Sequence, residues 1–302
     1  MTTTETLLPQ ARSAAPSVAG SYMELTKPGI VTFIMLAAAT GYFMAPGEIG
    51  SVFHFINTVL GTGLTAAGAA AFNQYVERLP DAQMERTAHR PLPSGRVSSR
   101  AALIFGLLLT VLGLAPLVLF VGWLTALLAA VSWVAYVFVY TPLKRRTPLC
   151  TLVGAVPGAL PIVAGWSARA SIAELAPWTL FALMFCWQIP HFLSLAWLYR
   201  AEYAKAGFRM ITSFDPIGRR TARVSMVFAG LLAVATTLPF GIRIAHGFYG
   251  VTAPLVGLLF FAVAAGMRPG AMETGARRLF LMSLVYLPTV FSLLLLDRFY
   301  LR

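Results

Sequence analysis

The stretch that decides the fold is Ala101-Ala-Leu-Ile-Phe-Gly-Leu-Leu-Leu-Thr110-Val-Leu-Gly-Leu-Ala-Pro-Leu-Val-Leu-Phe120-Val121. It contains no Asp, Glu, Lys or Arg. An α-helix rises about 1.5 Å per residue, so roughly 20 apolar residues cross the ~30 Å hydrocarbon layer of a bilayer. The length and apolarity of this stretch therefore predict a membrane-spanning helix.

Uncharged apolar runs of similar length recur along the chain. Nine are present, at about 30–46, 52–72, 101–121, 123–141, 149–167, 176–198, 224–242, 248–266 and 279–296. Gly122 and Trp123 indicate a tight turn between the third and fourth runs. Short segments of alternating polarity do not occur, which excludes a β-barrel. We expect an all-α, polytopic membrane protein, a bundle of nine transmembrane helices.

The composition of the whole chain agrees with membrane insertion. Of its 302 residues, 58% are hydrophobic and 11% are charged, and the mean hydropathy is +0.75, whereas soluble domains have about 25% charged residues. These values exclude an ordinary soluble enzyme and a disordered chain. We attribute the formal net charge of +12 to topology in the lipid bilayer, and we expect no nucleic-acid partner.

Basic residues predict the orientation. With the N-terminus in the cytoplasm, 19 of the 23 Lys and Arg residues fall in cytoplasmic segments, as the positive-inside rule requires. Residues 1–25 lack the apolar core of a signal peptide, and we expect a disordered cytosolic tail there. Residues 26–302 are expected to form a single transmembrane domain. Two long cytoplasmic loops, 73–100 and 199–223, are the expected location of the functional residues.

Oxygen-bearing side chains recur in the first of these loops. Asn73, Glu77, Asp81 and Glu85 are four residues apart, a spacing that places them on one face of a helix. Like charges at that spacing repel, whereas a row of oxygen ligands suits Mg²⁺. A solvated juxtamembrane helix would show the same pattern. Pro80 is expected to kink the row between Glu77 and Asp81.

Basic side chains follow the acidic row and the fourth apolar run. Arg86 and Arg90 carry planar guanidinium groups that match phosphate oxygens. Lys144, Arg145 and Arg146 form a second cluster, for which anchoring at the cytoplasmic face of the membrane is the alternative interpretation.

Four ordered motifs carry a resemblance to a known family. They are Asn73-x-x-x-Glu-x-x-x-Asp81 with Met84-x-Arg-Thr-x-x-Arg-Pro-Leu-Pro93, Tyr140-Thr-Pro-Leu-Lys-Arg-Arg-Thr-Pro148, Gly154-Ala-Val-Pro-Gly-Ala-Leu-Pro161 and Trp187-Gln-Ile-Pro-His-Phe192. Together they resemble the membrane-embedded polyprenyltransferases related to 4-hydroxybenzoate polyprenyltransferase, and within these the haem-modifying members. The resemblance extends from about Thr26 through the final run.

The resemblance implies a Mg²⁺-dependent site for a polyprenyl diphosphate. Asn73, Glu77 and Asp81 fall on the family's first Asp-rich motif and would be catalytic residues that hold Mg²⁺ against the diphosphate. Glu202 is the candidate metal ligand of a second acidic site, with Asp215 as the alternative. The residues that fall on the diphosphate-binding positions are Arg86, Arg90, Lys144 and Arg145.

His191 lies within the sixth run, directly after Pro190. Ionisable residues inside a membrane are costly, which favours a functional role. In the light of the resemblance, His191 and Trp187 are candidates to contact a porphyrin, with His191 as a possible iron ligand because neutral imidazole binds iron. A neutral imidazole that only hydrogen-bonds a neighbouring helix is the alternative.

The resemblance further implies the reaction and its setting. We expect transfer of a farnesyl group from farnesyl diphosphate to a vinyl group of haem b, with addition of water, giving haem O and diphosphate for haem–copper oxidase biogenesis. Partners could include haem A synthase or oxidase assembly factors. The expected location is the cell (inner) membrane, with the active site facing the cytoplasm. A quinone-precursor acceptor is the first alternative. A transporter is the second, but it would place charges inside the spans.

Overall fold

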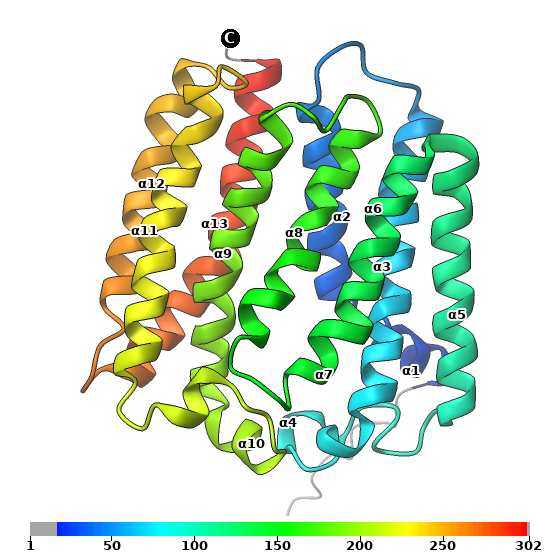
Figure 1. Cartoon of the computed structure of the whole chain (residues 1–302), viewed down its shortest axis with the longest axis vertical. Coiled ribbons are helices and arrows are strands. Elements are labelled where there is room, and N and C mark those ends of the chain that lie inside the picture. Colours follow the sequence, from blue (N-terminus) through cyan, green and yellow to red (C-terminus); the bar gives the residue numbers. More distant parts are fainter. Residues whose placement is uncertain (1–16, 301–302) are drawn as a thin grey trace, which may run out of the picture.

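The computed structural model describes residues 17–300 as long helices that run side by side through the molecule (Figure 1). Each of the nine expected apolar runs coincides with one long helix or helix series. The bounds are α2 Pro28–Met44, α3 Val52–Asp81, α5 Ser99–Pro116, α6 Trp123–Val134, α8 Cys150–Ser167, α9 Ala176–Leu198, α11 Arg219–Gly241, α12 Gly247–Ala265 and α13 Met272–Phe299. The predicted all-helical membrane fold is therefore confirmed.

Eight of these helices or helix series are long and apolar enough to cross a membrane by themselves. A ninth is counted when α2 and the short preceding helix, bent by 50° against each other, are taken as one span. The number nine and the orientation of the bundle stay predictions.

Two spans end in π-helical turns. A π-helix, Leu117–Val121, follows α5, and Ala135–Tyr140 continues α6 into the short helix α7, Thr141–Leu143. Gly122 separates the two spans with a φ of 153°, which only glycine adopts readily, so the predicted tight turn is confirmed. π-Helical turns often occur at functional sites, and the second one carries two tyrosines of the site described below.

Short helices gather at one end of the bundle, the lower end in Figure 1. They are α1 Val18–Leu25, α4 Glu85–Ala88, α7, α10 Arg200–Lys205 and the 3₁₀-helix Ile211–Phe214. The prediction of a disordered tail is wrong for residues 18–25, because α1 is capped by Ser17 and buries Leu25 against the bundle. The rest of the predicted tail, residues 1–16, lies outside the described residues.

Burial divides the bundle into outer and inner helices. The apolar face of α5 is exposed at Leu107, Leu108, Val111 and Leu112, as expected for a surface that contacts lipid. In contrast, α8 and α9 bury most of their side chains. The cavity described below is lined mainly by α2, α3, α6, α8, α9 and α13, which we call the inner helices.

The backbones of α2 and α8 lie in close contact at two glycines. A Cβ added to Gly41 would lie 1.9 Å from the carbonyl oxygen of Ile162, and one added to Gly165 would lie 1.9 Å from that of Ala38. No side chain fits at either position. The two glycines let the helix backbones touch, as small residues do between membrane helices.

Candidate active site

A cavity of about 500 Å³ opens between the inner helices near the end that carries the short helices. Its volume is typical of small-molecule sites. The wall is apolar along most of the bundle, with residues such as Ile30, Ala66, Leu128 and Leu284, and charged at the mouth. Such a cavity suits an amphiphile with a long apolar part and a charged head.

The predicted acidic row lies at the charged mouth. α3 extends beyond the apolar run through Pro80 to Asp81, so Asn73, Glu77 and Asp81 stay on one helix and are 0%, 6% and 1% exposed. Asn73 donates from Nδ2 to Thr141 Oγ1 at 3.1 Å. This bond turns its Oδ1 toward Lys27, whose Nζ donates to it at 2.5 Å.

The carboxylates of Glu77 and Asp81 are each paired with a cation. Lys144 Nζ lies 2.8 Å from Glu77 Oε1 and 4.7 Å from the centre of the Tyr140 ring. Arg90 Nη1 lies 2.8 Å from Asp81 Oδ2. Burial is the largest single effect and lowers the pKa of Lys144, but Glu77 together with Tyr140 and Tyr136 holds this pKa well above the usual value. The site therefore holds a lysine that stays protonated at neutral pH.

Arg86 has an unused donor. Its Nη2 donates to the hydroxyl of Tyr203 at 3.3 Å, and its guanidinium carbon lies 4.7 Å from the centre of the Tyr199 ring. Its Nε is buried without a hydrogen-bond partner among residues 17–300. A buried donor of a charged group is costly to leave unpaired, and here it belongs to a side chain that lines the cavity. This geometry favours an anionic ligand.

Five candidates from the sequence do not line the cavity: Asn73, which lies behind Lys27, and the four residues that follow. Arg145 is exposed, because it follows Lys144 in a helical turn and consecutive side chains there point about 100° apart. Glu202 accepts a hydrogen bond from the backbone N–H of Arg86 at 3.0 Å, so it joins the two loops. Asp215 accepts from Thr221 N–H at 2.7 Å in the first turn of α11. Glu85 is exposed, since α3 has already ended at Asp81.

The oxygen donors on α3 fit a hard divalent cation. Among residues 17–300 no three His, Cys, Asp or Glu side chains are clustered as a metal site. However, the carboxylates of Glu77 and Asp81 line the charged mouth, Asn73 Oδ1 lies behind Lys27, and each of these oxygen groups pairs with a Lys or Arg side chain. Mg²⁺ prefers oxygen ligands and is usually completed by water and phosphate. The donor set therefore suits a metal that arrives with a diphosphate.

His191 lies on the apolar wall, on α9. Its imidazole stacks between Trp187 and Phe280, with ring centres 5.0 Å and 5.2 Å away. Its Nδ1 lies 2.7 Å from Ser283 Oγ, and Trp187 Nε1 donates to the carbonyl of Ser283 at 2.9 Å. The structure thus brings both predicted porphyrin contacts to one wall, and α13 fixes their orientation.

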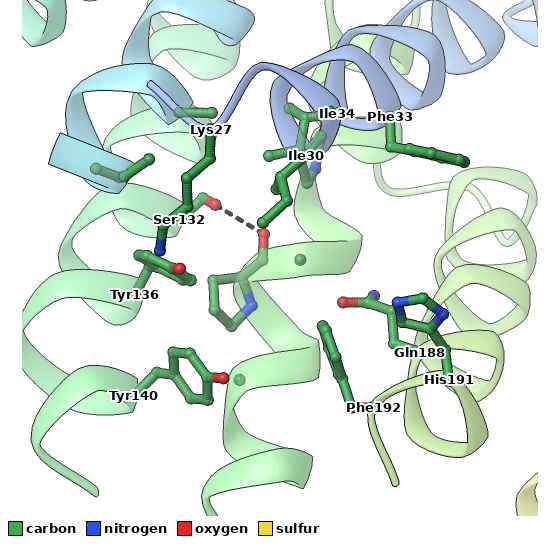
Figure 2. Close-up of a pocket in the computed structure, with 18 of the residues that line it drawn as sticks. Lys27, Ile30, Phe33, Ile34, Ser132, Tyr136, Tyr140, Gln188, His191 and Phe192 are labelled. Atoms are coloured by element: carbon green, nitrogen blue, oxygen red, sulfur yellow. Dashed lines mark hydrogen bonds between the residues drawn. The ribbon is translucent and has the colours of Figure 1, made fainter. Parts of the chain in front are cut away.

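Sequence reasoning missed several residues of the cavity. Lys27 has a left-handed backbone, with φ of 52°, and precedes Pro28 at the start of α2. Its position at the mouth depends on that turn, which the sequence marks only by a lysine before Pro-Gly. Tyr136 and Tyr140 reach the cavity through the π-helical turn (Figure 2). Gln188 lies within the Trp187–Phe192 motif, but no role was predicted for it from the sequence.

Fold and site together define a membrane enzyme that binds an amphiphile with a polyanionic head. The chain belongs to the UbiA prenyltransferase family, whose model matches residues 34–285. It is 41% identical over 288 residues to the protoheme IX farnesyltransferase of Solibacter usitatus (strain Ellin6076), covering 92% of this chain and 98% of that protein. It is 40% identical over 300 residues to the protoheme IX farnesyltransferase of Koribacter versatilis (strain Ellin345), covering 95% and 96%.

Solved structures of low sequence identity share the fold. A structure of digeranylgeranylglyceryl phosphate synthase matches with a TM-score of 0.76 at 15% identity, covering 93% of this chain and 98% of that one. A UbiA homologue from Archaeoglobus fulgidus bound to GPP and Mg²⁺ matches with a TM-score of 0.68 at 17% identity, covering 91% and 99%. The chain is therefore a multi-span membrane prenyltransferase.

Proposed function

We propose that this prenyltransferase transfers a farnesyl group from farnesyl diphosphate to a vinyl group of haem b, with addition of water, giving haem O and diphosphate. One observation carries the proposal: an apolar cavity ends in buried acidic and half-buried basic side chains. This combination suits a diphosphate head and a long hydrocarbon tail. The names of the curated relatives support farnesyl as the donor and protohaem IX as the acceptor.

The diphosphate is proposed to lie at the mouth of the cavity. Arg86, Arg90 and Lys144, predicted from the sequence, and Lys27, added from the structure, are its donors. Arg86 offers its free Nε. Arg90 and Lys144 would exchange a carboxylate partner for a phosphate oxygen. These cations stabilise the negative charge that develops on the leaving group when the allylic carbon–oxygen bond breaks.

Asn73, Glu77 and Asp81 are the proposed Mg²⁺ ligands. The oxygen donors released from Lys27, Lys144 and Arg90 would hold the metal, which supplies Lewis-acid stabilisation of the departing diphosphate. The ring faces of Tyr136 and Tyr140 lie beside the mouth, where they can stabilise an allylic cation and exclude water from it.

The acceptor is proposed to lie against α9 and α13. His191 is eight residues before Tyr199, about 12 Å deeper along the helix axis. At that level Trp187, His191 and Phe280 stack on one another, and the edge of this aromatic stack would contact a porphyrin. The tail of the donor would extend on the other side, along the small side chains of α3 such as Ala66 and Ala69.

The cellular setting is part of the proposal. Residues 26–302 would form a single transmembrane domain in the cell (inner) membrane, with the mouth of the cavity facing the cytoplasm. There the product would be delivered to haem A synthase or oxidase assembly factors for haem–copper oxidase biogenesis. A quinone precursor, a smaller aromatic acceptor, is the alternative substrate.

The decisive experiment is mass analysis of haem extracted from cells with and without this protein. Haem O is expected only when the protein is present. Membranes incubated with farnesyl diphosphate and either haem b or 4-hydroxybenzoate separate the two acceptors. Prenylation of 4-hydroxybenzoate alone would contradict the proposal.

A further inference from the structure

Gln188 presents an unused acceptor to the cavity. Its side chain is 3% exposed, and its Nε2 donates to the carbonyls of Met184 at 3.2 Å and Ala155 at 3.3 Å. These two bonds hold Nε2 against the backbone carbonyls of the two helices, so Oε1 is the end of the amide that faces the cavity. The remaining atom, Oε1, has no hydrogen bond within the part of the chain that the structure describes. In an apolar wall such an atom is costly unless a ligand or water pairs with it.

The backbone opposite leaves room for this oxygen. A Cβ added to Gly158 would lie 2.0 Å from Gln188 Oε1, so the oxygen occupies the space of a missing side chain. Figure 2 shows the Gln188 amide oxygen pointing toward the middle of the cavity, between the α9 wall and the wall that carries Tyr136. The position of the amide is therefore built by α8 and α9 together.

His191 provides a second acceptor on the same face of α9. Ser283 Oγ donates its one hydrogen to the carbonyl of Phe280 at 2.6 Å. We assign the hydroxyl hydrogen to this carbonyl, so that the hydroxyl accepts from His191 and Nδ1 is the donor of the 2.7 Å bond. In a neutral imidazole the lone pair is left on Nε2, for which residues 17–300 provide no partner. Residues 188 and 191 are three apart, a spacing that makes side chains neighbours on a helix.

We propose that Gln188 Oε1 and His191 Nε2 hold the water molecule that is added to the vinyl group, an inference that rests on the proposed function. Water would donate one hydrogen to each acceptor, which leaves its oxygen lone pairs free to attack. A buried water needs at least two polar partners, and the structure supplies two otherwise unpaired ones. The water is thereby placed on the wall assigned to the acceptor, away from the allylic cation.

The proposed reaction accounts for every bond that forms and breaks. The carbon–oxygen bond of farnesyl diphosphate breaks and its electron pair leaves with diphosphate. The π electrons of the vinyl group form the new carbon–carbon bond to farnesyl C1, which leaves a cation on the vinyl carbon attached to the porphyrin ring. The water oxygen bonds to that carbon, and the released proton passes to His191 Nε2. Without positioned water the cation would instead lose a proton from the neighbouring carbon and give an alkene.

The test compares product ratios of purified wild-type, Gln188→Leu and Gln188→Glu proteins supplied with farnesyl diphosphate and haem b. Gln188→Leu removes the acceptor at similar size, whereas Gln188→Glu keeps a carboxyl oxygen there. We expect Gln188→Leu to lower the ratio of haem O to its alkene counterpart, lighter by one water molecule, by about tenfold or more. Gln188→Glu should retain more haem O than Gln188→Leu. Farnesyl diphosphate affinity should be unchanged in both.

A second variant tests the proposal even if Gln188→Leu does not fold. Gly158→Ala puts a methyl group 2.0 Å from the present position of Oε1, so the amide has to move away from the water site, and the product ratio should shift in the same direction. Unchanged product ratios in folded Gln188→Leu and Gly158→Ala would overturn the water site. So would a wild-type haem spectrum showing an iron–imidazole bond that is absent in His191→Ala, because Nε2 would then be occupied by iron. The proposed function fails separately, when the wild-type protein makes no haem O.

Discussion

Arg86→Gln isolates the role of the unpaired guanidinium donor. The substitution removes the positive charge and the Nε–H, whose buried nitrogen has no partner in the described structure. A hydrogen bond to a charged group contributes about 1.5–3 kcal/mol. We therefore expect kcat/KM for farnesyl diphosphate to fall by about 10- to 150-fold, since ~1.4 kcal/mol corresponds to a factor of ten.

The assay varies farnesyl diphosphate at saturating haem b with purified protein. Arg86→Lys keeps the charge but loses the planar fork, so it should recover only part of the loss. Arg145→Gln and Arg146→Gln change two exposed residues. Each should alter kcat/KM by less than about threefold, because exposed charges contribute little. Equal losses in Arg86→Gln and Arg145→Gln would refute the placement of the diphosphate, as would wild-type kinetics in Arg86→Gln.

Three further outcomes are expected. Glu77→Ala and Asp81→Ala should abolish turnover while the protein still inserts, because the metal–diphosphate contacts are lost; wild-type activity of folded Glu77→Ala in excess EDTA would contradict the metal assignment. Lys27→Met should raise KM for farnesyl diphosphate by about tenfold; unchanged steady-state kinetics would mean that Lys27 only hydrogen-bonds Asn73. His191→Ala should weaken use of haem b far more than binding of farnesyl diphosphate, measured by Soret titration and donor affinity; an unchanged haem affinity and turnover would leave His191 a packing role.

The spans could be predicted because apolar composition alone decides membrane insertion. The end of a span is harder to predict. α3 continues past the apolar run to Asp81, since helix formation there depends on contacts with neighbouring helices and loops rather than on hydropathy. For α1 the sequence predicted disorder where a helix forms. The burial of α1 depends on Leu92, Val97 and Ala102, which are distant in sequence.

The site was predictable at the level of motifs but not of individual side chains. Lys144 and Arg145 are adjacent and chemically similar, and only the direction of the helical turn separates them. Ser283 lies 92 residues from His191, and no local pattern shows that these residues meet. Likewise the orientation of the Gln188 amide is set by carbonyl groups on two helices.

The glycine contact between α2 and α8 has a mechanical consequence. Gly41 lies 13 residues after Pro28, about 20 Å along the helix axis, and Lys27 stands at the opposite end of the same rigid rod. Any side chain larger than hydrogen at Gly41 or Gly165 would push α2 and α8 apart at this end. The opposite end of α2, next to Lys27, would then change its position relative to α8. A methyl group added far from any substrate would thus move Lys27 at the mouth relative to Gly158 on α8. Residues that touch no reactant can therefore alter catalysis through the tilt of a helix.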